Sequence, residues 1–303
     1  MKLLVTGGTG FIGAALCRTL GQQGHDVLAL SRSPDRHRPT PGLRVLSWNS
    51  EEWRRAIEGM DGVINLAGEP LVAARWSARQ KRIIQESRLE STRTLIEALA
   101  SSPKRPGVLI NASAVGYYGP RGDEVLAETD APGSGFLAEL CRAWEAHAQR
   151  AEPLGMRVVR LRIGVVLGAG GGALAKMVPP FRWWVGGPLG TGRQWVSWIH
   201  RDDVTGLIAW ALTHPELAGP VNATAPSPVT MRTLCKELAR VLRRPCWAPV
   251  PGPVLRVALG EMAEVLLTGQ RVLPQAALRL GYPFRYPELP QALRACLSPG
   301  ASR

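Results

Sequence analysis

The chain begins Met1-Lys2-Leu3-Leu4-Val5-Thr6-Gly7-Gly8-Thr9-Gly10-Phe11-Ile12-Gly13. A short apolar run ends in a glycine cluster, and Ala15, Leu16 and Leu20 follow with the spacing of one helix face. This succession predicts a strand, a tight turn and the N-terminus of a helix. Backbone N–H groups and the positive end of the helix dipole form an anion site at such a turn. The stretch therefore predicts a site for the pyrophosphate of a dinucleotide.

Each glycine of the turn has its own expected role. Gly7 permits the turn itself, Gly10 lets the backbone approach the phosphates, and Gly13 allows the helix to pack closely on the strand. The run fits both the G-x-G-x-x-G and the G-x-x-G-x-x-G spacing. Glycine-rich turns are common, so the position of this one between a strand and a helix is what favours a dinucleotide site.

Length and composition describe an ordinary globular protein. The 303 residues are 45% hydrophobic and 20% charged, enough for one large α/β domain or for a domain with a smaller lobe. No apolar run approaches the ~20 residues of a membrane span, so we expect no membrane partner. The first strand is expected to start at Leu3, so we expect no signal peptide before the fold. The five cysteines are scattered, fit neither a disulfide framework nor a metal site, and favour a cytoplasmic protein with reduced thiols.

The net charge of +13 has two interpretations. One is a polyanionic partner such as RNA or DNA. The other is an arginine-rich composition together with a phosphate-bearing cofactor. Basic residues are spread along the whole chain without a long run, and no RNA-binding signature is present, which weighs against nucleic acid.

Periodicity along the chain indicates alternating strands and helices. We expect strands at residues 26–30, 44–48, 62–68, 108–111, 157–162 and 221–223, and helices at 51–58, 77–100, 136–151, 231–242, 254–267, 274–280 and 287–297, with a further helix that enters through an aspartate N-cap near Asp202. This order predicts an α/β fold, a Rossmann-type doubly wound parallel sheet with a small C-terminal substrate lobe. Residues 1–168, completed by 198–225, form the expected NADP-binding domain, and 169–197 with 226–303 form the lobe.

The end of the second strand bears on the choice of cofactor. NAD-binding folds place an acidic residue there to bind the ribose hydroxyls, whereas this chain has Ser31-Arg32-Ser33. A guanidinium flanked by hydroxyls suits a 2′-phosphate, so the stretch favours NADPH over NADH. The alternative is that Arg32 is simply solvated.

Later strands end in residues that suit a cofactor crevice. Leu66, Ala67 and Gly68 follow a buried strand and are expected on the nicotinamide–ribose side, where small residues permit close approach. Ser113, Tyr117 and Tyr118 follow the strand at 108–111, where the catalytic groups of such a fold lie.

Several stretches together resemble a known family. They are Thr6 to Gly13, Ser31-Arg32, Asn65-Leu66-Ala67-Gly68-Glu69, Ser87-Arg88, Gly187-Pro188-Leu189-Gly190-Thr191-Gly192, Trp198-Ile199-His200, Asn222-Ala223-Thr224-Ala225-Pro226 and Gly269-Gln270-Arg271-Val272 with Pro274. Over nearly its whole length the chain resembles the atypical, epimerase-like subfamily of the extended short-chain dehydrogenases/reductases. The resemblance implies an NADP(H)-binding Rossmann domain whose cofactor contacts include Gly7, Thr9, Gly10, Phe11, Ile12, Gly13, Ser31, Arg32, Leu66, Ala67, Gly68, Arg88 and Val166.

The chain departs from the superfamily at its catalytic pair. The superfamily uses Tyr-x-x-x-Lys, but no tyrosine here has a lysine four residues later, and Leu137 and Cys141 stand where the pair would be. If redox chemistry occurs, Tyr117 or Tyr118 near Ser113 is the best remaining proton donor. His200 is a weaker candidate, since a structural hydrogen bond near Asp202 would equally explain it.

Two functions follow from these residues. The first is an NADPH-dependent oxidoreductase or epimerase-like enzyme acting on a small carbonyl or sugar-like substrate. The second is a non-catalytic NADPH-binding sensor or regulator. Tryptophans usually belong to a core; Trp195 and Trp198, beside a glycine-rich loop, are the two that we expect near a substrate. The sequence predicts neither the substrate nor the oligomeric state.

Overall fold

The computed structural model of the chain describes residues 1–37, 42–72 and 74–298. Its first elements are β1 (Lys2–Thr6) and α1 (Gly13–Gln22), joined by the glycine-rich turn. Alternate side chains of a strand point to opposite faces of the sheet. Leu3 and Val5 accordingly pack with α1 in one core, while Leu4 lies in a separate core on the other face. The expected strand–turn–helix unit is confirmed.

The central sheet has seven strands in the order β11-β7-β5-β4-β1-β2-β3, and every neighbouring pair is parallel. The remaining strands of the sheet are β2 (Asp26–Ser31), β3 (Leu43–Ser47), β4 (Gly62–Asn65), β5 (Val108–Ala114), β7 (Arg157–Ile163) and β11 (Gly219–Ala223). The strand order reverses direction between β1 and β4, the place at which doubly wound sheets open a crevice for a cofactor. The predicted fold class is confirmed.

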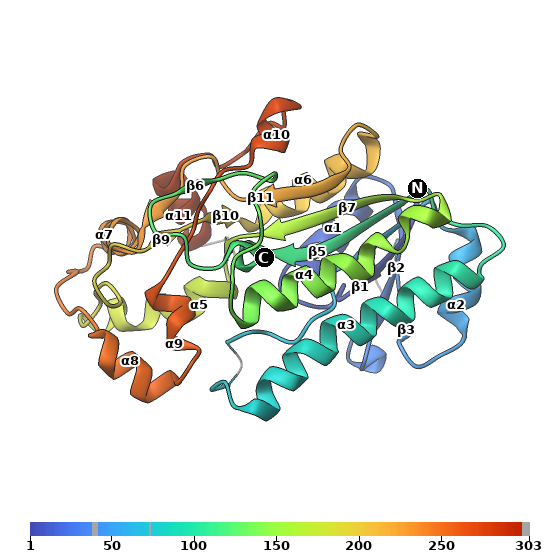
Figure 1. Cartoon of the computed structure of the whole chain (residues 1–303). Helices are drawn as coiled ribbons and strands as arrows, with labels where there is room; N and C mark the ends of the chain where they lie inside the picture. The colour runs from blue at the N-terminus through green and yellow to red at the C-terminus, as the bar shows by residue number, and fades with distance from the viewer. Residues whose placement is uncertain (38–41, 73, 299–303) are drawn as a thin grey trace.

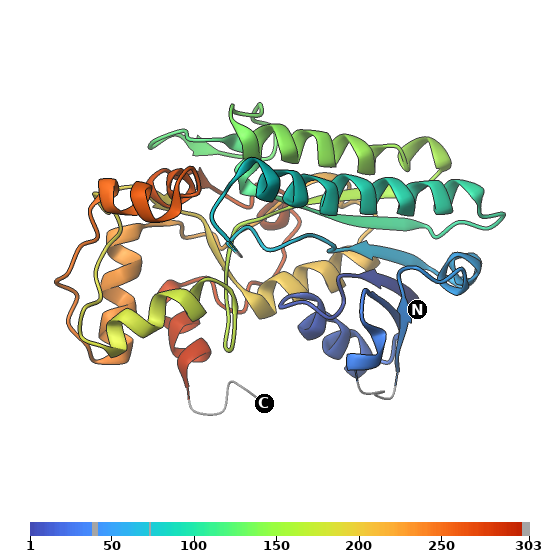
Figure 2. The ribbon, with the colours of Figure 1, turned by 90° about the horizontal axis from the view of Figure 1, so that it is seen from below.

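Helices cover both faces of this sheet. On one face lie α1 and α6 (Arg201–Thr213). On the other lie α2 (Glu52–Ala56), α3 (Ala78–Ser101) and α4 (Phe136–Gln149). Figure 1 shows the sheet between the two layers, and Figure 2 shows α3 and α4 side by side across it from α1 and α6. Buried hydrophobic residues on both faces make this the main core.

A second group of elements packs beside the sheet, at the left of Figure 1. Its helices are α5 (Gly172–Arg182), α7 (Met231–Leu242), α8 (Gly252–Leu259), α9 (Ala263–Leu267) and α11 (Leu289–Leu297). α10 (Gln275–Arg279) instead packs in the main core beside β11. Short strand pairs join it to the sheet: β8 (Val165–Leu167) with β10 (Trp198–His200), β9 (Trp195–Val196) with β12 (Val229–Thr230), and β6 (Val125–Leu126) with β13 (Arg271–Val272). α5, α7 and α11 share a core of their own.

The structure differs from the expected elements at three places. The single helix expected at 254–267 is two helices, because Gly260 adopts a φ of +62° that ends α8. α5 was not foreseen, since Pro179 and Pro180 lie inside it. The N-cap of α6 is His200 rather than an aspartate, because the His200 Nδ1 accepts the N–H of Asp202 at 3.1 Å.

Candidate functional site

The turn between β1 and α1 has room for glycine alone at two positions. Gly7 has a φ of +66°, and a Cβ on it would lie 2.6 Å from the Leu66 carbonyl oxygen. A Cβ on Gly13 would lie 2.1 Å from the Gly7 carbonyl oxygen, so any larger residue would push α1 off the turn. The tight turn and the close helix approach expected of these glycines are therefore both present.

The N-terminus of α1 is suited to an anion. The structure, over the residues that it describes, gives α1 no side-chain cap and no acidic residue in its first turn. The Ala14 N–H donates to the Gly10 carbonyl at 2.8 Å and the Leu16 N–H to the Ile12 carbonyl at 2.9 Å, whereas the Gly13 N–H has no backbone partner among the described residues and can donate to a ligand. Gly10 is exposed and Thr9 is half-buried, which leaves the turn open to solvent. These residues fit a dinucleotide pyrophosphate.

Phe11 connects this turn to the end of the sheet. Its ring lies close to Gly168, Gly171 and Gly172, where added Cβ atoms would come within 3 Å of it. The guanidinium of Arg201 lies 5.1 Å from the ring centroid. A Cβ on Gly172 would also lie 2.8 Å from the carbonyl oxygen of Val166, which is half-buried in β8. Phe11 therefore brings Val166 and the segment after β8 to the edge of the glycine turn.

Ser31 and Arg32 lie at the carboxyl end of β2, beside that turn. Ser31 is buried, and its Oγ accepts the N–H of Ser33 at 3.1 Å. The Arg32 side chain is 86% exposed, with its Nη2 3.7 Å from an oxygen of Glu69. So exposed a pair contributes little to stability. The guanidinium is therefore free to turn toward a phosphate.

Arg88 reaches the same edge of the sheet from α3. Its guanidinium packs against Gly68, where an added Cβ would come 3.0 Å from the Arg88 Cζ. The same Cζ lies 5.2 Å from the centroid of the Trp144 ring. Nη1 donates to the Ile84 carbonyl at 3.0 Å. Burial lowers the pKa of Arg88 from its ordinary value. The side chain thus supports the Leu66–Gly68 turn from below, with Leu66 and Ala67 half-buried above the sheet.

A buried amide network fixes the end of β4. Asn65 accepts from the Thr6 hydroxyl at 2.5 Å and donates to Thr92 at 2.9 Å and to Asn111 at 2.6 Å. Thr6 also accepts the N–H of Ala67 at 3.3 Å. The network links β1, β4, β5 and α3 at the crevice, and it was not predicted as a unit.

A second buried network lies where β5, β7 and α4 meet. Arg162 donates from Nε and Nη2 to the two Glu145 oxygens, at 2.9 and 3.0 Å. Ser113 donates to Glu145 at 2.7 Å, and Arg162 Nη1 donates to the Tyr118 hydroxyl at 2.9 Å. Burial alone would lower the pKa of the Arg162 guanidinium, but the hydrogen bonds and charge of Glu145 outweigh it and raise that pKa. Arg162 and Glu145 were missed as a pair; a charged residue within a central parallel strand is the signal that could have found them.

The three expected catalytic residues meet at this network. Tyr118 is fully buried, and its hydroxyl bonds Asn222 at 2.8 Å and the Ala127 carbonyl at 2.9 Å; burial raises its pKa to about 12. Ser113 is also buried, with its hydroxyl held by Glu145. Tyr117 is half-buried, with the Arg162 Cζ 3.5 Å from its ring centroid. Within the described residues the Tyr117 hydroxyl has no hydrogen-bond partner, so it is the one of the three that is free to meet a ligand.

The helix that carries the superfamily's catalytic pair has apolar contacts here. Leu137 lies against Gly116, where a Cβ would come 3.2 Å from the Leu137 Cβ. Cys141 is buried, and burial raises the pKa of its thiol to about 11. At neutral pH this thiol is therefore protonated and does not replace a lysine ammonium.

Two other candidates have structural roles. His200 is 4% exposed and caps α6; burial lowers its pKa to about 4. Trp198 is fully buried and donates to the Ser227 carbonyl at 2.9 Å, so the expectation that it lies at a substrate surface is wrong. Trp195 is half-buried and donates to Asp123 at 2.6 Å.

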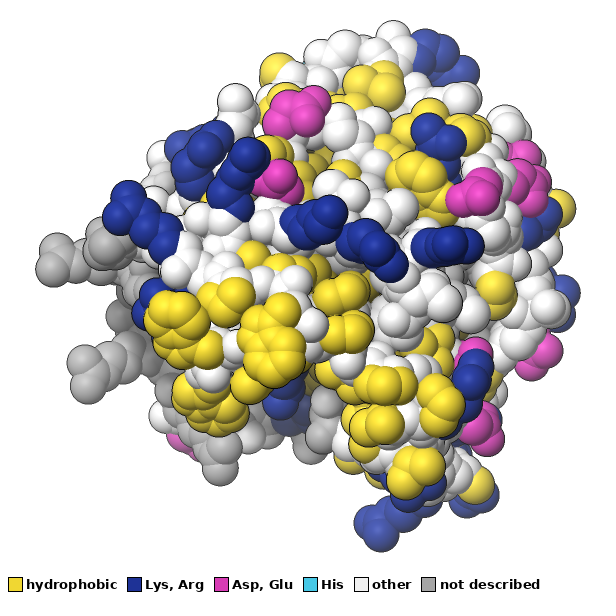
Figure 3. Space-filling view, turned by 90° about the vertical axis from the view of Figure 1, so that its left-hand side faces the viewer, with side chains coloured by type: hydrophobic (Ala, Val, Ile, Leu, Met, Phe, Trp, Pro, Cys, Tyr) yellow, Lys and Arg dark blue, Asp and Glu magenta, His cyan; other side chains and the backbone are white. Residues whose placement is uncertain are grey.

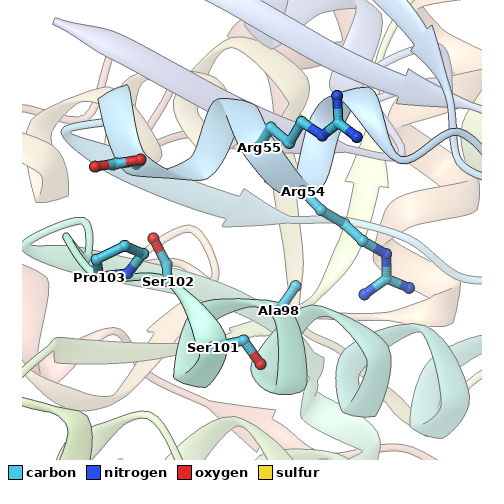
Figure 4. A pocket seen from close by; sticks show the side chains of 7 residues that line it. Arg54, Arg55, Ala98, Ser101, Ser102 and Pro103 are labelled. Carbon is cyan, nitrogen blue, oxygen red and sulfur yellow. The ribbon is translucent and has the colours of Figure 1, made fainter.

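Two of the hollows on the described surface differ in where they lie relative to the sheet. One of about 430 Å³ lies between α2, with Arg54 and Arg55, and the end of α3, with Ala98 to Pro103 (Figure 4). It is at the amino-terminal edge of the sheet, opposite the glycine turn, and so is not the cofactor crevice. The other, of about 300 Å³, is lined by Asp123, Thr191, Arg193 and Trp195 among others. The described residues contain no group of three or more His, Cys, Asp or Glu placed to hold a metal ion.

Comparisons with known proteins agree with this geometry. Residues 3–223 match the model of the NAD dependent epimerase/dehydratase family, and residues 250–296 match DUF1731, a domain of unknown function. The chain is 44% identical to the chloroplastic epimerase family protein SDR39U1 homolog of Arabidopsis thaliana, over 98% of this chain and 87% of that protein. It is 40% identical to the epimerase family protein YfhF of Bacillus subtilis, over 97% of both chains. The crystal structure of human epimerase family protein SDR39U1 (isoform 2) with NADPH matches 98% of this chain and 99% of that one, with a TM-score of 0.88 at 35% identity.

Proposed function

Because this chain belongs to the NAD-dependent epimerase/dehydratase family, we propose that it binds NADPH in the crevice above β1 and β4 and reduces or epimerises a small carbonyl or sugar-like substrate. The observation that carries the proposal is the glycine turn, with the uncapped N-terminus of α1 behind it and the exposed Arg32 beside it. The match to a human protein crystallised with NADPH supports the same cofactor.

We assign a different part of the cofactor to each group of residues. The pyrophosphate lies against the backbone of Gly10 and accepts from the Gly13 N–H at the positive end of the α1 dipole, and Phe11 with Val166 closes that side of the crevice. Arg32 and Ser31 bind the 2′-phosphate of the adenine ribose. Leu66, Ala67 and Gly68, supported by Arg88 from below, shape the nicotinamide–ribose side. When bound, the cofactor supplies or accepts a hydride.

The chemistry assigned to the protein is proton transfer. Tyr117 is the proposed donor, because its hydroxyl is free of partners in the described structure while those of Ser113 and Tyr118 are engaged. The Arg162 guanidinium under its ring holds the ring in one orientation. Ser113, Tyr118 and Glu145 then act as positioning residues that hold Arg162.

The substrate would enter from the smaller lobe. We assign to residues 169–197 and 226–303 the wall facing the crevice. The hollow beside Trp195 lies between Asp123, from the loop after Tyr118, and residues of that lobe. This hollow is the proposed place for the part of the substrate remote from the reacting carbon.

Cofactor choice is tested by titrating the protein with NADPH and NADH and following nucleotide fluorescence. We expect NADPH to bind at least about tenfold tighter, which corresponds to ~1.4 kcal/mol, and Arg32→Ala to remove most of that preference. Arg44→Ala is the matched control, because Arg44 is also an exposed arginine, 71% against 86% for Arg32, and lies on the neighbouring β3, paired with Glu52. Equal affinity of the wild-type protein for the two nucleotides would refute the assignment of Arg32.

The second candidate function is a non-catalytic NADPH-binding sensor or regulator. It is favoured by Leu137 and Cys141 at the positions of the catalytic pair and by the engaged hydroxyls of Ser113 and Tyr118. Following NADPH absorbance at 340 nm over a panel of aldehydes, ketones and nucleotide sugars separates the two functions. Turnover that Tyr117→Phe abolishes without loss of NADPH affinity supports the enzyme. Tight NADPH binding without turnover of any panel member supports the sensor, and turnover that survives Tyr117→Phe removes Tyr117 as the donor.

A further inference from the structure

The smaller lobe exposes large hydrophobic side chains at one end of the molecule. Trp183 is 74% exposed and Trp247 is 66% exposed, and Trp184 and Val185 are exposed beside them. On α8, Val254 and Val257 are one helical turn apart and both point outward, with Val257 79% exposed. Helices of globular proteins normally turn such residues inward. α8 buries Leu255 and packs Leu259 against a small core, so Val254 and Val257 are apolar residues in addition to those that its packing uses.

Hydrogen bonds hold the Trp247 segment against the segment that carries Trp184. The Trp247 indole N–H donates to the Trp184 carbonyl at 2.7 Å, and the Trp247 backbone N–H donates to the Gly186 carbonyl at 3.1 Å. The chain then runs from Trp247 through Pro251 directly into α8. We call this surface the tryptophan face; it consists of Trp183, Trp184, Val185, Trp247, Val254 and Val257.

The two stretches that carry the tryptophan face are basic, although Glu264, just beyond the second stretch, pairs with Arg256 of α8 at 2.8 Å. No Asp or Glu occurs from residue 153 to 201 or from residue 238 to 260, the two stretches that build it. Arg182 and Arg243 are exposed next to the tryptophans, and the Arg244 guanidinium lies 4.6 Å from the Trp184 ring centroid. Figure 3 shows the hydrophobic side chains in two separate groups over the lower half of this end of the molecule, with a row of Lys and Arg side chains above them.

The combination of exposed tryptophans, valines and arginines favours one kind of binding partner over others. Exposed indoles and arginines are the side chains that settle at the boundary between lipid headgroups and acyl chains. Valines on α8 would enter the acyl region, and the arginines would meet anionic headgroups. Nucleic acid offers phosphates to the arginines but nothing to outward valines. A second copy of the chain, paired about a two-fold axis, would bring Arg182 and Arg243 against basic residues of the same kind.

We propose that the tryptophan face docks the protein on the surface of an anionic phospholipid bilayer. The contact is peripheral: among the described residues, no helix is both long and apolar enough to cross a membrane. It places part of the +13 charge, for which the cofactor alone does not account, at a lipid surface. The contact is independent of the proposed chemistry, since the tryptophan face contains none of the cofactor or catalytic candidates.

Sedimentation with vesicles tests the proposal. The full chain is mixed with vesicles of phosphatidylcholine alone, or of two parts phosphatidylcholine to one part phosphatidylglycerol, and the bound fraction is measured. We expect binding to the anionic vesicles only, weakened by salt. Trp183→Ser with Val257→Ser should weaken binding at least about tenfold. Leu278→Ser, which changes an exposed hydrophobic residue on α10, is the matched control and should bind as the wild type does.

Further measurements keep the outcome interpretable. Circular dichroism melts confirm that the variants are folded, and Arg182→Glu tests the charge without touching the hydrophobic residues. Failure to bind anionic vesicles at low salt, or binding that the double variant leaves unchanged, overturns the proposal. So does a dimer in sedimentation equilibrium that the double variant dissociates, or retention on RNA that it abolishes.

Discussion

Replacing Glu145 by Gln tests how far the interior depends on the network around Arg162. The two carboxylate oxygens accept from Arg162 Nε, Arg162 Nη2 and Ser113 Oγ, and the three residues are at most 3% exposed. The amide keeps the volume of the side chain but removes its charge, so the guanidinium stays buried with only neutral partners. Removing one member of such a pair costs about 3–5 kcal/mol.

The chain length converts this cost into a melting temperature. An unfolding entropy of about 2.1 cal/mol/K per residue over 303 residues gives about 0.64 kcal/mol/K. A loss of about 4 kcal/mol therefore lowers Tm by about 6 °C. Since domains are stable by ~5–15 kcal/mol, Glu145→Gln should remain folded at room temperature, with about a quarter to four fifths of its free energy of unfolding lost.

The assay is thermal unfolding followed by circular dichroism, with Arg93→Gln as the matched control. Arg93 also has two carboxylate contacts, with Glu90 and Glu97, but these lie on the exposed surface of α3. Exposed pairs contribute ~0–1 kcal/mol, so the control should lower Tm by less than about 2 °C. Exchanging Arg162 and Glu145 together for leucines should recover part of the loss, because no unpaired charge is then buried. A Glu145→Gln shift no larger than that of Arg93→Gln would refute the reasoning.

Three further predictions concern the turn, the α6 cap and α8. Gly13→Ala places a Cβ 2.1 Å from the Gly7 carbonyl oxygen and should weaken NADPH binding at least about tenfold in fluorescence titrations. Gly21→Ala in the same helix is the control, because its Cβ would have no atom within 4 Å, and it should bind NADPH as the wild type does. In the folded protein the pKa of His200 is about 4, below the ordinary 6.5, so between these pH values the unfolded chain binds the extra proton. The free energy of unfolding therefore falls as pH drops from 6.5 toward 4, by at most about 1.4 kcal/mol per pH unit. His200→Asn should flatten this pH dependence in urea-unfolding measurements, and an unchanged slope would contradict the assignment. Gly260→Ala must adopt a φ of +62° with its Cβ 2.9 Å from the Arg75 Nε, and should lower Tm measurably in calorimetry; an unchanged Tm would show that α8 and α9 tolerate another connection.

The fold was predictable because its signals are local. The glycines between β1 and α1 mark the turn, and strands such as β4 are short apolar runs that are buried along their whole length. Local signals failed where two effects competed. Pro179 and Pro180 argue against a helix, so α5 was not predicted. Gly260 is compatible with one long helix in the sequence, and only its positive φ shows that α8 ends there.

The candidate site was only partly predictable, since its catalytic side depends on contacts between distant residues. Ser113 and Tyr118 were placed correctly at the end of β5 by strand geometry. That their hydroxyls are held by Glu145 and Asn222 depends on α4 and β11, 32 and 104 residues further along the chain. No spacing rule links such positions. The structure was needed to distinguish Tyr117 from its neighbour.

The way the chain crosses between the sheet and the smaller lobe has a consequence for engineering. Val204 and Leu207 of α6, and Ala277 and Tyr282 near the C-terminus, share one core with Leu3 and Val5 of β1. A cut after residue 168 would therefore remove the edge strand β11 from the sheet, and it would also remove the residues that α6 and the C-terminal segment contribute to this core. Neither part is an excisable module, and exchanging the lobe for that of a relative requires grafting both of its segments at once. The same interleaving couples the two parts during unfolding, so the molecule should melt in one cooperative step.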